Sequence, residues 1–395
     1  MRETDKIHWY AYVLPCAVAM ALGWGVRGQY GGEKGAVLAG AMLAAALGLV
    51  TRDPAKRRRA PWIVLAGLGF GFGGMMSYGE ITGYVAHPER GVGFPSEWAM
   101  LQHAWGVRLW GLAGMGIVAG IWGWLAGLFL GVAVTDRAYG WRDGLAIVVL
   151  AIVGGIVGHA LFIKWLGVTT SSRSDFWATL LGVTAAFYIY AAAAKRDRAA
   201  RVLGFGGLIG FGLAFPLLHL MHVFLSPHVP LRWYDWWKIV EQGLGLFGGA
   251  AIALGLFYLD RSGHRAREAI ARPRLERAAL AFAVWLPVFW NGRNNFTYWC
   301  YERKILAAQA VEAWRVVGEI SAIALTVWVM HTAMRPIARR YVVVAYLILI
   351  WFATIGSGLK MAFPYSGIGW VTVQIGFTLM AVALTAHALL VGRER

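Results

Sequence analysis

The side chains that could do chemistry in this sequence are mostly ionisable groups that lie beside or inside long apolar runs. We predict that they line a substrate-binding cavity, and they are Arg27, Glu33, Lys34, Glu80, His103, Arg108, His219, His222, Glu241, Arg293, Asn294 and Glu319. A charge inside a bilayer is costly, so it usually faces a partner or a water-filled cavity. The polar groups gather toward one end of the apolar runs, which favours a cavity that opens on one side of a membrane.

The segment Gly23–Gly35, GWGVRGQYGGEKG, is the most glycine-rich polar run of the chain. It matches G-x-G-x-x-G, but that pattern binds nucleotides only within a βαβ unit, and here it follows an apolar helix. We expect a tight turn in which glycine adopts a positive φ. Lys34 and nearby N–H groups can hold an anion at a helix N-terminus; alternatively, Glu33 pairs with Arg27 or Lys34 and holds the turn.

His219, His222 and Glu241 have the donor types of a zinc site. No HExxH motif accompanies them, and we expect hydrogen-bonded packing or proton relay rather than a metal. In an enzyme, Glu241 or Glu319 would act as acid or base while Arg27 or Arg293 held an anion. No catalytic or cofactor motif specifies such a reaction, so catalytic residues and cofactors stay undefined.

The composition explains what must position these groups. The chain is 59% hydrophobic and 14% charged, whereas soluble domains carry about 25% charged residues. Apolar runs recur along all 395 residues, and each approaches the roughly 20 residues that cross a bilayer as a helix. We therefore predict an all-α polytopic membrane protein formed by a single transmembrane domain, residues 1–395. The net charge of +17 comes from arginines in short loops, which indicates membrane topology and not nucleic-acid binding.

The apolar runs predict about twelve spans: 7–24, 34–51, 61–83, 98–134, 143–166, 175–194, 202–225, 235–259, 277–292, 311–333, 341–361 and 370–391. The fourth is too long for one straight crossing, and we expect it to tilt, to start along the interface, or to break near Gly111–Gly116. Lys and Arg concentrate in alternate loops, including 51–60, 195–201 and 260–277, which places both termini in the cytoplasm. We interpret the polar segment 291–304 as an outer loop, which is either solvated or forms a wall or lid over a polar ligand.

The spans form six hairpins, and several returning helices start with an acid before a tryptophan, as in Asp235–Trp236. The acid caps the helix and the tryptophan favours the interface. Glu241 and Glu319 recur at one place in two hairpins, which with other echoes suggests weak parallel repeats over 61–134, 202–259 and 277–333. Glycines spaced by four, such as Gly123, Gly127 and Gly131, predict closely packed helices.

These features favour a transporter for a small polar or anionic solute with an outward-facing polar cavity, in a prokaryotic plasma (inner) membrane. The first alternative is an integral membrane enzyme that acts on a lipid-linked or outer-face substrate. The second is a structural subunit whose polar groups only satisfy one another. The expected partners are the lipid bilayer and the solute or lipid-linked substrate, with a homo-oligomer or membrane partner subunits as further alternatives and with no nucleic acid.

Overall fold

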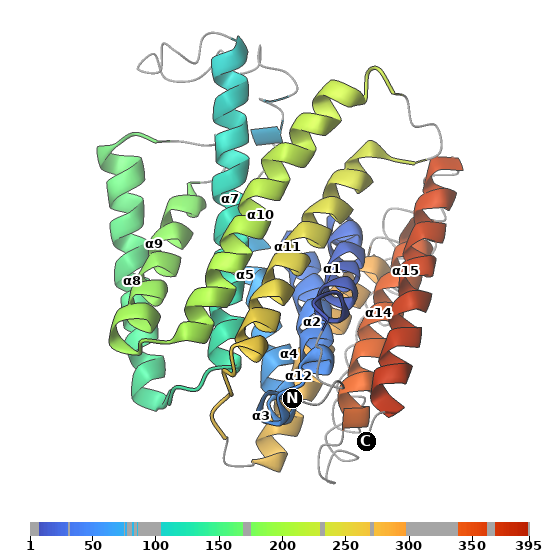
Figure 1. Ribbon diagram of the computed structural model, residues 1–395. Helices are drawn as coiled ribbons and strands as arrows, with labels where there is room; N and C mark the ends of the chain where they lie inside the picture. The colour runs from blue at the N-terminus through green and yellow to red at the C-terminus, as the bar shows by residue number, and fades with distance from the viewer. Residues whose placement is uncertain are drawn as a thin grey trace.

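Every regular element in the described part of the chain is a helix (Figure 1). The computed structural model describes residues 8–30, 32–74, 76, 81–82, 85, 104–168, 175–229, 234–268, 272–297, 339–361 and 368–393. Within these ranges, 9 helices are long and apolar enough to cross a membrane. Their lengths and compositions indicate an integral membrane protein with several spans.

The helices follow the predicted apolar runs closely, and the predicted span 311–333 lies outside the described residues. In chain order they are α1 (Tyr10–Tyr30), α2 (Gly32–Val50), α3 (Pro54–Arg58), α4 (Ala60–Gly67), α5 (Phe70–Gly74), α7 (Ala104–Ala133), α8 (Trp141–His159) with the π-helical η4 (Ala160–Trp165), α9 (Phe176–Ile189) with the π-helical η5 (Tyr190–Ala194), α10 (Arg198–Leu225), α11 (Trp236–Arg261), α12 (Pro273–Thr297), α14 (Arg339–Met361) and α15 (Ile368–Arg393).

Two predicted spans differ in form from the expectation. The third is not one helix: α4 and α5 are separated at Leu68 and Gly69, where the close approach of the Phe129 ring leaves no room for a Cβ at Gly69. The fourth is a continuous α-helix over Ala104–Ala133, so the predicted break near Gly111–Gly116 is wrong. Small residues there serve helix packing, since Gly116 lies against the Gly212 carbonyl of α10.

The expected outer loop at 291–304 is helical where the structure describes it, because α12 continues through Thr297. The Asn291 side chain is fully buried and donates to the carbonyls of Lys34 and Pro287 at 3.0 and 2.7 Å. The amide thereby ties α12 to the start of α2. This part of the segment is a helix–helix contact and not a loop.

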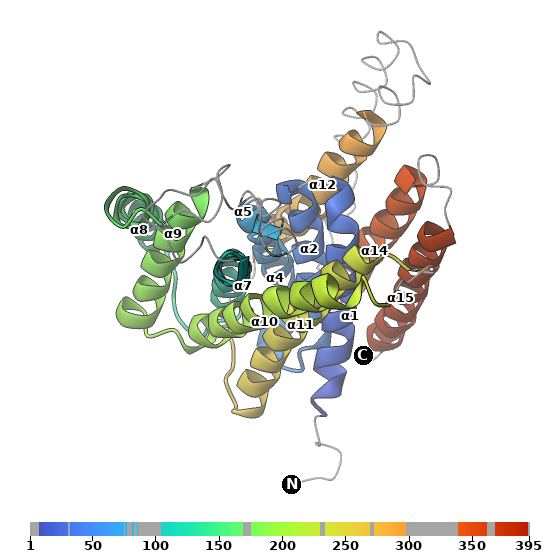
Figure 2. The same cartoon turned by 90° about the horizontal axis from the view of Figure 1, so that it is seen from above.

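The core lies where α1 and α2 are surrounded by other helices, with α7 packed on α10 and α1 packed on α11 (Figures 1 and 2). The predicted glycine contacts are confirmed along the α7–α10 pair. A Cβ at Gly123 would lie 2.1 Å from the Gly207 carbonyl oxygen, and one at Gly127 would lie 2.2 Å from the Leu203 carbonyl oxygen. Only glycine permits backbones this close.

The glycine-rich segment Gly23–Gly35 is helical on both sides of Gly31, which lies outside the described residues. Its described glycines do not have positive φ, so the expected turn conformation is wrong for them. Instead, the absence of a side chain at these glycines lets neighbouring helices approach closely. A Cβ at Gly23 would meet Ala39 of α2 at 2.6 Å, and one at Gly32 would meet the Gly74 carbonyl at 2.3 Å.

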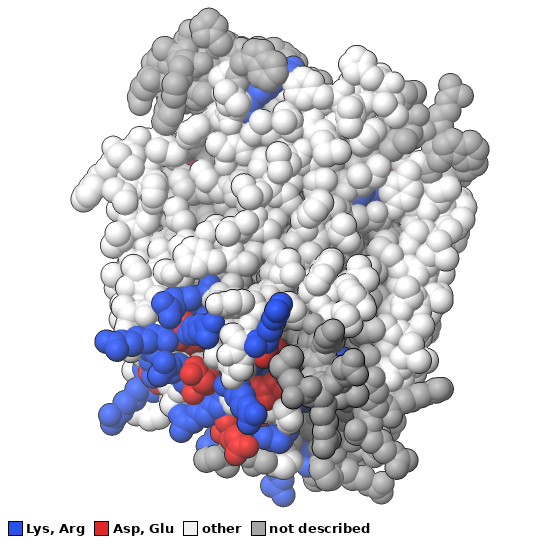
Figure 3. All heavy atoms as spheres, in the orientation of Figure 1, with Lys and Arg blue, Asp and Glu red and all other residues white. Residues whose placement is uncertain are grey.

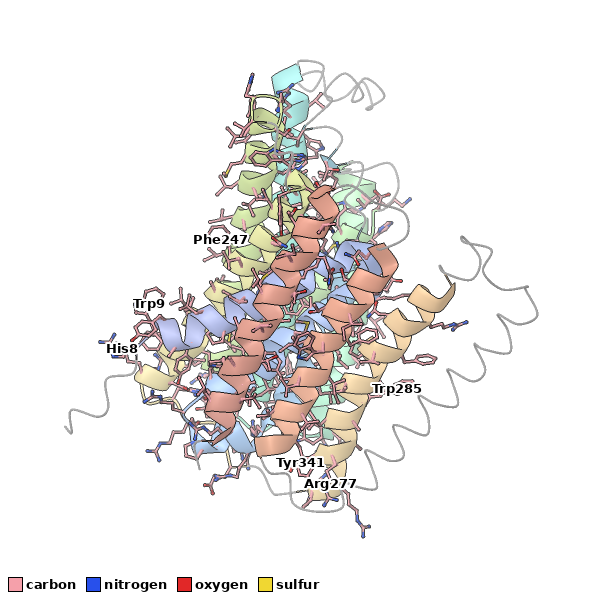
Figure 4. All side chains as sticks on the ribbon, turned by 90° about the vertical axis from the view of Figure 1, so that its right-hand side faces the viewer. His8, Trp9, Phe247, Arg277, Trp285 and Tyr341 are labelled. Atoms are coloured by element: carbon pink, nitrogen blue, oxygen red, sulfur yellow. The ribbon has the colours of Figure 1, made fainter. Side chains whose placement is uncertain are left out.

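Charged residues gather at one end of the bundle, which we call the basic end (Figure 3). It comprises the described parts of the connections 51–59, 134–140, 195–197 and 262–268. The side view in Figure 4 shows Arg277 at the lower end of α12 and Trp285 further along the same helix, which packs beside α14. The charge distribution agrees with the predicted grouping of the arginine-rich loops.

Candidate functional site

Helices α1 and α11 form an antiparallel pair that we call the seam. Tyr12 lies beside Asp260 at the basic end, and Gly25 lies beside Lys238 at the opposite end. Between them, a Cβ at Gly245 would lie 2.3 Å from the Met20 carbonyl oxygen. The seam therefore has a glycine-mediated contact in the middle and a charged contact at each end.

The contact at the opposite end is formed by Lys238 and Glu241, which we call the seam pair. Both side chains are buried; the Lys238 ammonium donates to Glu241 Oε2 and to the Gly25 carbonyl, the latter at 3.0 Å. Glu241 Oε1 occupies the space that a Cβ would need at Gly28. Glycine at position 28 thus gives the Glu241 carboxylate access to the α1 backbone, whereas a Cβ at Gly25 would meet Phe377 and Gln242.

Arg27 lies on α1 between the two glycines that the seam pair touches. Its side chain is 2% exposed, and its guanidinium lies 5.0 Å from the Trp24 ring centroid and 5.1 Å from that of Trp122 on α7. Aromatic faces attract a cation electrostatically, and more strongly when water is excluded. Arg27 packs toward α7, whereas Lys238 and Glu241 approach from α11, and all three meet the same turn of α1. We call these three residues the charged cluster.

His219 and His222 form a second group, beside the first turn of α11. Their rings lie 5.5 Å apart, and His219 Nε2 lies 3.2 Å from the Thr82 carbonyl. Trp237 contacts both imidazoles, at centroid distances of 5.7 and 6.0 Å. Glu241 joins the seam pair instead of these histidines, and the described residues contain no group of three metal-ligating side chains.

The remaining candidates do not meet in one described cavity. Arg108 of α7 stacks on Phe224 at 5.6 Å, Glu33 and Lys34 start α2, and Arg293 is exposed on α12. Glu80, His103 and Glu319, and the side chain of Asn294, lie outside the described part of the structure. The common cavity therefore stays a prediction, and of its described residues Arg27 and Glu241 meet the same turn of α1.

A third polar group, the basic-end network, closes the other end of the seam. The Asp260 carboxylate accepts from the Tyr12 hydroxyl at 2.6 Å, from Thr51 Oγ1 at 3.0 Å and from Lys56. Lys56 is fully buried and also donates to the His264 carbonyl at 2.7 Å. The network joins α1, the end of α2, α3, α11 and the connection that follows α11.

His264 is the histidine beside this network, and its side chain is 5% exposed. Burial lowers the pKa of its imidazole below 6.5, and the Lys56 ammonium lowers that pKa further. Asp136, whose Oδ1 lies 3.5 Å from His264 Nε2, acts in the opposite direction. We therefore expect a neutral imidazole near neutral pH.

Sequence reasoning found Arg27 and Glu241 but missed Lys238 and the whole basic-end network. The signal for Lys238 is present, because residues three apart share one face of a helix, and Lys238 precedes Glu241 by three. The network joins Tyr12, Lys56 and Asp260, which are far apart in the chain. No local spacing relates them, so only the packing of α1, α3 and α11 brings them together.

The acid-before-tryptophan pattern has two described outcomes. Asp235 caps α11 as predicted, since its carboxylate accepts from the Trp237 N–H at 2.8 Å. Asp175 precedes α9 without a side-chain capping bond. The pattern therefore marks helix starts but does not guarantee the capping contact.

No protein-family model, curated protein or solved structure matches this chain. The functional interpretation therefore rests on the geometry of the chain itself.

Proposed function

We propose that the protein is a membrane transporter for a small polar or anionic solute, and that the solute binds at the charged cluster. The observation that carries this proposal is the seam itself: two long helices touch through glycine and are held by charged contacts at both ends. Buried charges within a membrane domain usually mark substrate or ion pathways. Arg27 and Lys238 would attract the anion, and Glu241 would release Lys238 as the solute arrives.

The seam suggests how access would alternate. Opening the seam at the charged cluster exposes Gly25 and Gly28 of α1, whose carbonyl oxygens lie near the C-terminal end of the helix and can accept hydrogen bonds from a polar solute. Opening at the basic end requires separation of Tyr12 from Asp260 and of Lys56 from Asp260. The glycine contact at Gly245 would act as the pivot, because the backbones there are too close to slide without rocking.

The orientation follows from charge. We propose that the basic end faces the cytoplasm of a prokaryotic cell, because cytoplasmic loops carry the excess of Lys and Arg. Ser262→Cys, in a background with Cys16→Ala and Cys300→Ser, would then resist a membrane-impermeant maleimide in intact cells and react after lysis. Labelling of Ser262→Cys in intact cells would reverse the orientation.

The transport test uses the purified protein in liposomes and a panel of radiolabelled phosphate, sulfate, acetate and lactate. We expect uptake of at least one anion, and its loss in Lys238→Met and Glu241→Gln while both variants remain folded by size-exclusion chromatography. Arg261→Gln is the matched control, since this exposed arginine ends the same helix. Uptake unchanged by both cluster variants would remove the charged cluster from the transport mechanism.

A second readout needs no knowledge of the solute. Cys16 is fully buried in the seam, and its carbonyl faces Gly249 of α11. In a Cys300→Ser background, a rocking seam would let a maleimide reach Cys16 slowly, and Asp260→Asn would raise that rate by loosening the basic end. A structural bundle predicts no reaction at Cys16 until the protein unfolds.

A further inference from the structure

A large groove lies on the opposite side of α2 from the seam, and we call it the lateral groove. Its volume is about 1080 Å³, and its walls come from α4, α5, the end of α7 and α12. Figure 2 shows α4 and α5 between α7 and α12, on the side of the bundle away from α10 and α11. Ligand pockets usually occupy about 300–1,000 Å³, so the groove is large enough for an extended ligand.

The walls of the groove are apolar and aromatic. Phe72 of α5 stacks on Phe129 of α7 with ring centroids 6.0 Å apart, and Phe282 and Trp290 of α12 line the facing side. Phe72 and Phe282 are 51% and 45% exposed, although both belong to helices that otherwise pack against the core. Exposed aromatic walls of this kind are expected to contact hydrocarbon.

Charge is distributed unequally along the groove. Arg59 and Arg137 line it at the basic end together with Tyr139, whose hydroxyl donates to Asp197 at 3.0 Å, whereas Glu33 lines it at the far end. A groove with cations at one end and a carboxylate at the other orients an amphiphile whose headgroup is anionic. The Glu33 end would repel that headgroup, so only one direction of binding is favourable.

The arginines at the basic end of the groove can donate hydrogen bonds to a ligand. Arg59 Nη1 donates to the carbonyls of Ala133 and Thr135 at 3.2 Å each. Asp197 and Asp53 interact with its charge from beyond ion-pair distance. A guanidinium carries five N–H donors, so Nε and Nη2 can bind an anion while Nη1 holds the guanidinium in place. Arg137 is exposed and lies 3.6 Å from Asp136, a single surface contact.

We propose that the lateral groove binds one anionic phospholipid from the leaflet at the basic end. The phosphate lies between Arg59 and Arg137, and one acyl chain follows the wall formed by α4 and α5. Arginine suits this role because its planar donors match phosphate oxygens in pairs. The site is separate from the charged cluster and does not depend on the proposed transport.

The dimensions agree with this occupant. The Ala60–Gly74 segment that forms one wall rises about 22 Å at 1.5 Å per residue, and one leaflet of hydrocarbon is about 15 Å thick. A lipid whose phosphate binds Arg59 therefore places its acyl chain beside Leu65, with the end of the chain directed toward Phe72. A zwitterionic lipid would bring a cationic choline to the arginine rim, so the groove selects for a net negative headgroup.

The test uses a photoactivatable phosphatidylglycerol with a diazirine in the acyl chain, and the phosphatidylcholine analogue as control. The intact protein is reconstituted with a trace of either probe, irradiated and digested, and the labelled peptides are identified by mass spectrometry. We expect phosphatidylglycerol to label peptides of α4, α5 and α12 around Phe72 and Phe282. Phosphatidylcholine should label the lipid-facing side chains of α8 and α10 without this preference.

Two kinds of variant test the two parts of the site. The double variant Arg59→Gln, Arg137→Gln should weaken phosphatidylglycerol retention about tenfold or more, as measured by native mass spectrometry, and Arg261→Gln should not. Ala66→Trp fills the groove and should reduce labelling, whereas Leu213→Trp on the exposed face of α10 should not. If the double variant fails to fold, Arg137→Gln alone decides, since its exposed side chain tolerates replacement.

Some outcomes would overturn the proposal. Equal retention of both lipids, unaffected by the arginine variants, would identify ordinary boundary lipid. Labels confined to other helices, or a co-purified peptide in the groove, would also refute a phospholipid site.

Discussion

The two ends of the α1–α11 seam are both closed by a lysine and a carboxylate, yet their surroundings differ. At the basic end, Asp260 accepts from Tyr12, Thr51 and Lys56, and these donors belong to separate segments. At the opposite end, Lys238 and Glu241 lie three apart on one helix, and in the described structure Glu241 accepts only from Lys238. The first contact joins several elements, whereas the second joins one helix to a single carbonyl of its neighbour.

This difference indicates different roles. A buried carboxylate with several donors is well compensated, and removing one member leaves the others buried without partners. A pair with few bonds can exchange a partner for a ligand at a lower cost. We therefore interpret the basic-end network as the structural clamp of the seam, and the charged cluster as the end at which a solute would compete for Lys238.

The largest expected effect is at the clamp. Asp260→Asn should lower the free energy of unfolding by about 3–5 kcal/mol, the usual loss when one partner of a buried ion pair is removed. The measurement is thermal or denaturant unfolding of the protein in detergent. The matched control is Glu268→Gln, whose pair with Arg58 is exposed on both sides and should contribute about 0–1 kcal/mol.

The comparison between the two ends would fail in one case. If Glu241→Gln destabilised the protein as much as Asp260→Asn, the two contacts would be equivalent clamps. The assignment of the charged cluster to solute binding would then lose its structural basis.

The middle of the seam is expected to respond to one methyl group. Gly245→Ala brings a Cβ to 2.3 Å from the Met20 carbonyl oxygen, so α1 and α11 must separate. Overpacking of this kind typically costs about 1–3 kcal/mol, and it should also change the rate at which a maleimide reaches Cys16. Unfolding and labelling measured on the same preparation test both expectations.

Gly144→Ala is the control for this substitution, because a Cβ at Gly144 of α8 meets nothing within 4 Å. Alanine favours a helix over glycine by roughly 1 kcal/mol, so this variant should be neutral or slightly stabilised. A similar response at Gly144 and Gly245 would show that helix propensity, and not the seam contact, dominates.

The sequence predicted the helical class and most helix positions because hydropathy acts locally. The run before Val50, for example, is uniformly apolar and becomes the deeply buried α2. The role of the glycines in Gly23–Gly35 is not fixed by the sequence, since a glycine that permits φ > 0 and one that permits close packing look identical there. Asn291 was assigned to a loop for a similar reason: its polarity suggests solvent, whereas its amide binds the Lys34 carbonyl inside the bundle.

Site prediction had a different limit. The Lys238–Glu241 spacing is local and could have been found, but Tyr12, Lys56 and Asp260 meet only because α1, α3 and α11 converge. The described arginine-rich loops do gather at one end of the bundle, and their lysines and arginines also form ordered contacts there. The positive-inside rule counts the charges in each loop. It does not distinguish Lys56, which is buried, from Arg58, which is exposed.

The smallest expected effect is the response of the clamp to pH, and it comes from His264. Burial and Lys56 lower the pKa of His264 below 6.5, so between that pKa and 6.5 the unfolded chain binds more protons than the folded one. The stability of the folded protein should therefore fall as the pH falls below about 6.5, the pKa of an unperturbed histidine.

His264→Gln removes this contribution and should flatten the slope of Tm against pH between about 8 and 5.5. The chain holds ten histidines, so the difference between wild type and variant is the quantity to compare. Asp136→Asn provides the opposite test: without the nearby carboxylate the pKa of His264 falls further, and the acid-induced loss of stability should become steeper. Parallel curves for wild type and His264→Gln would show that the clamp does not sense protonation at this position.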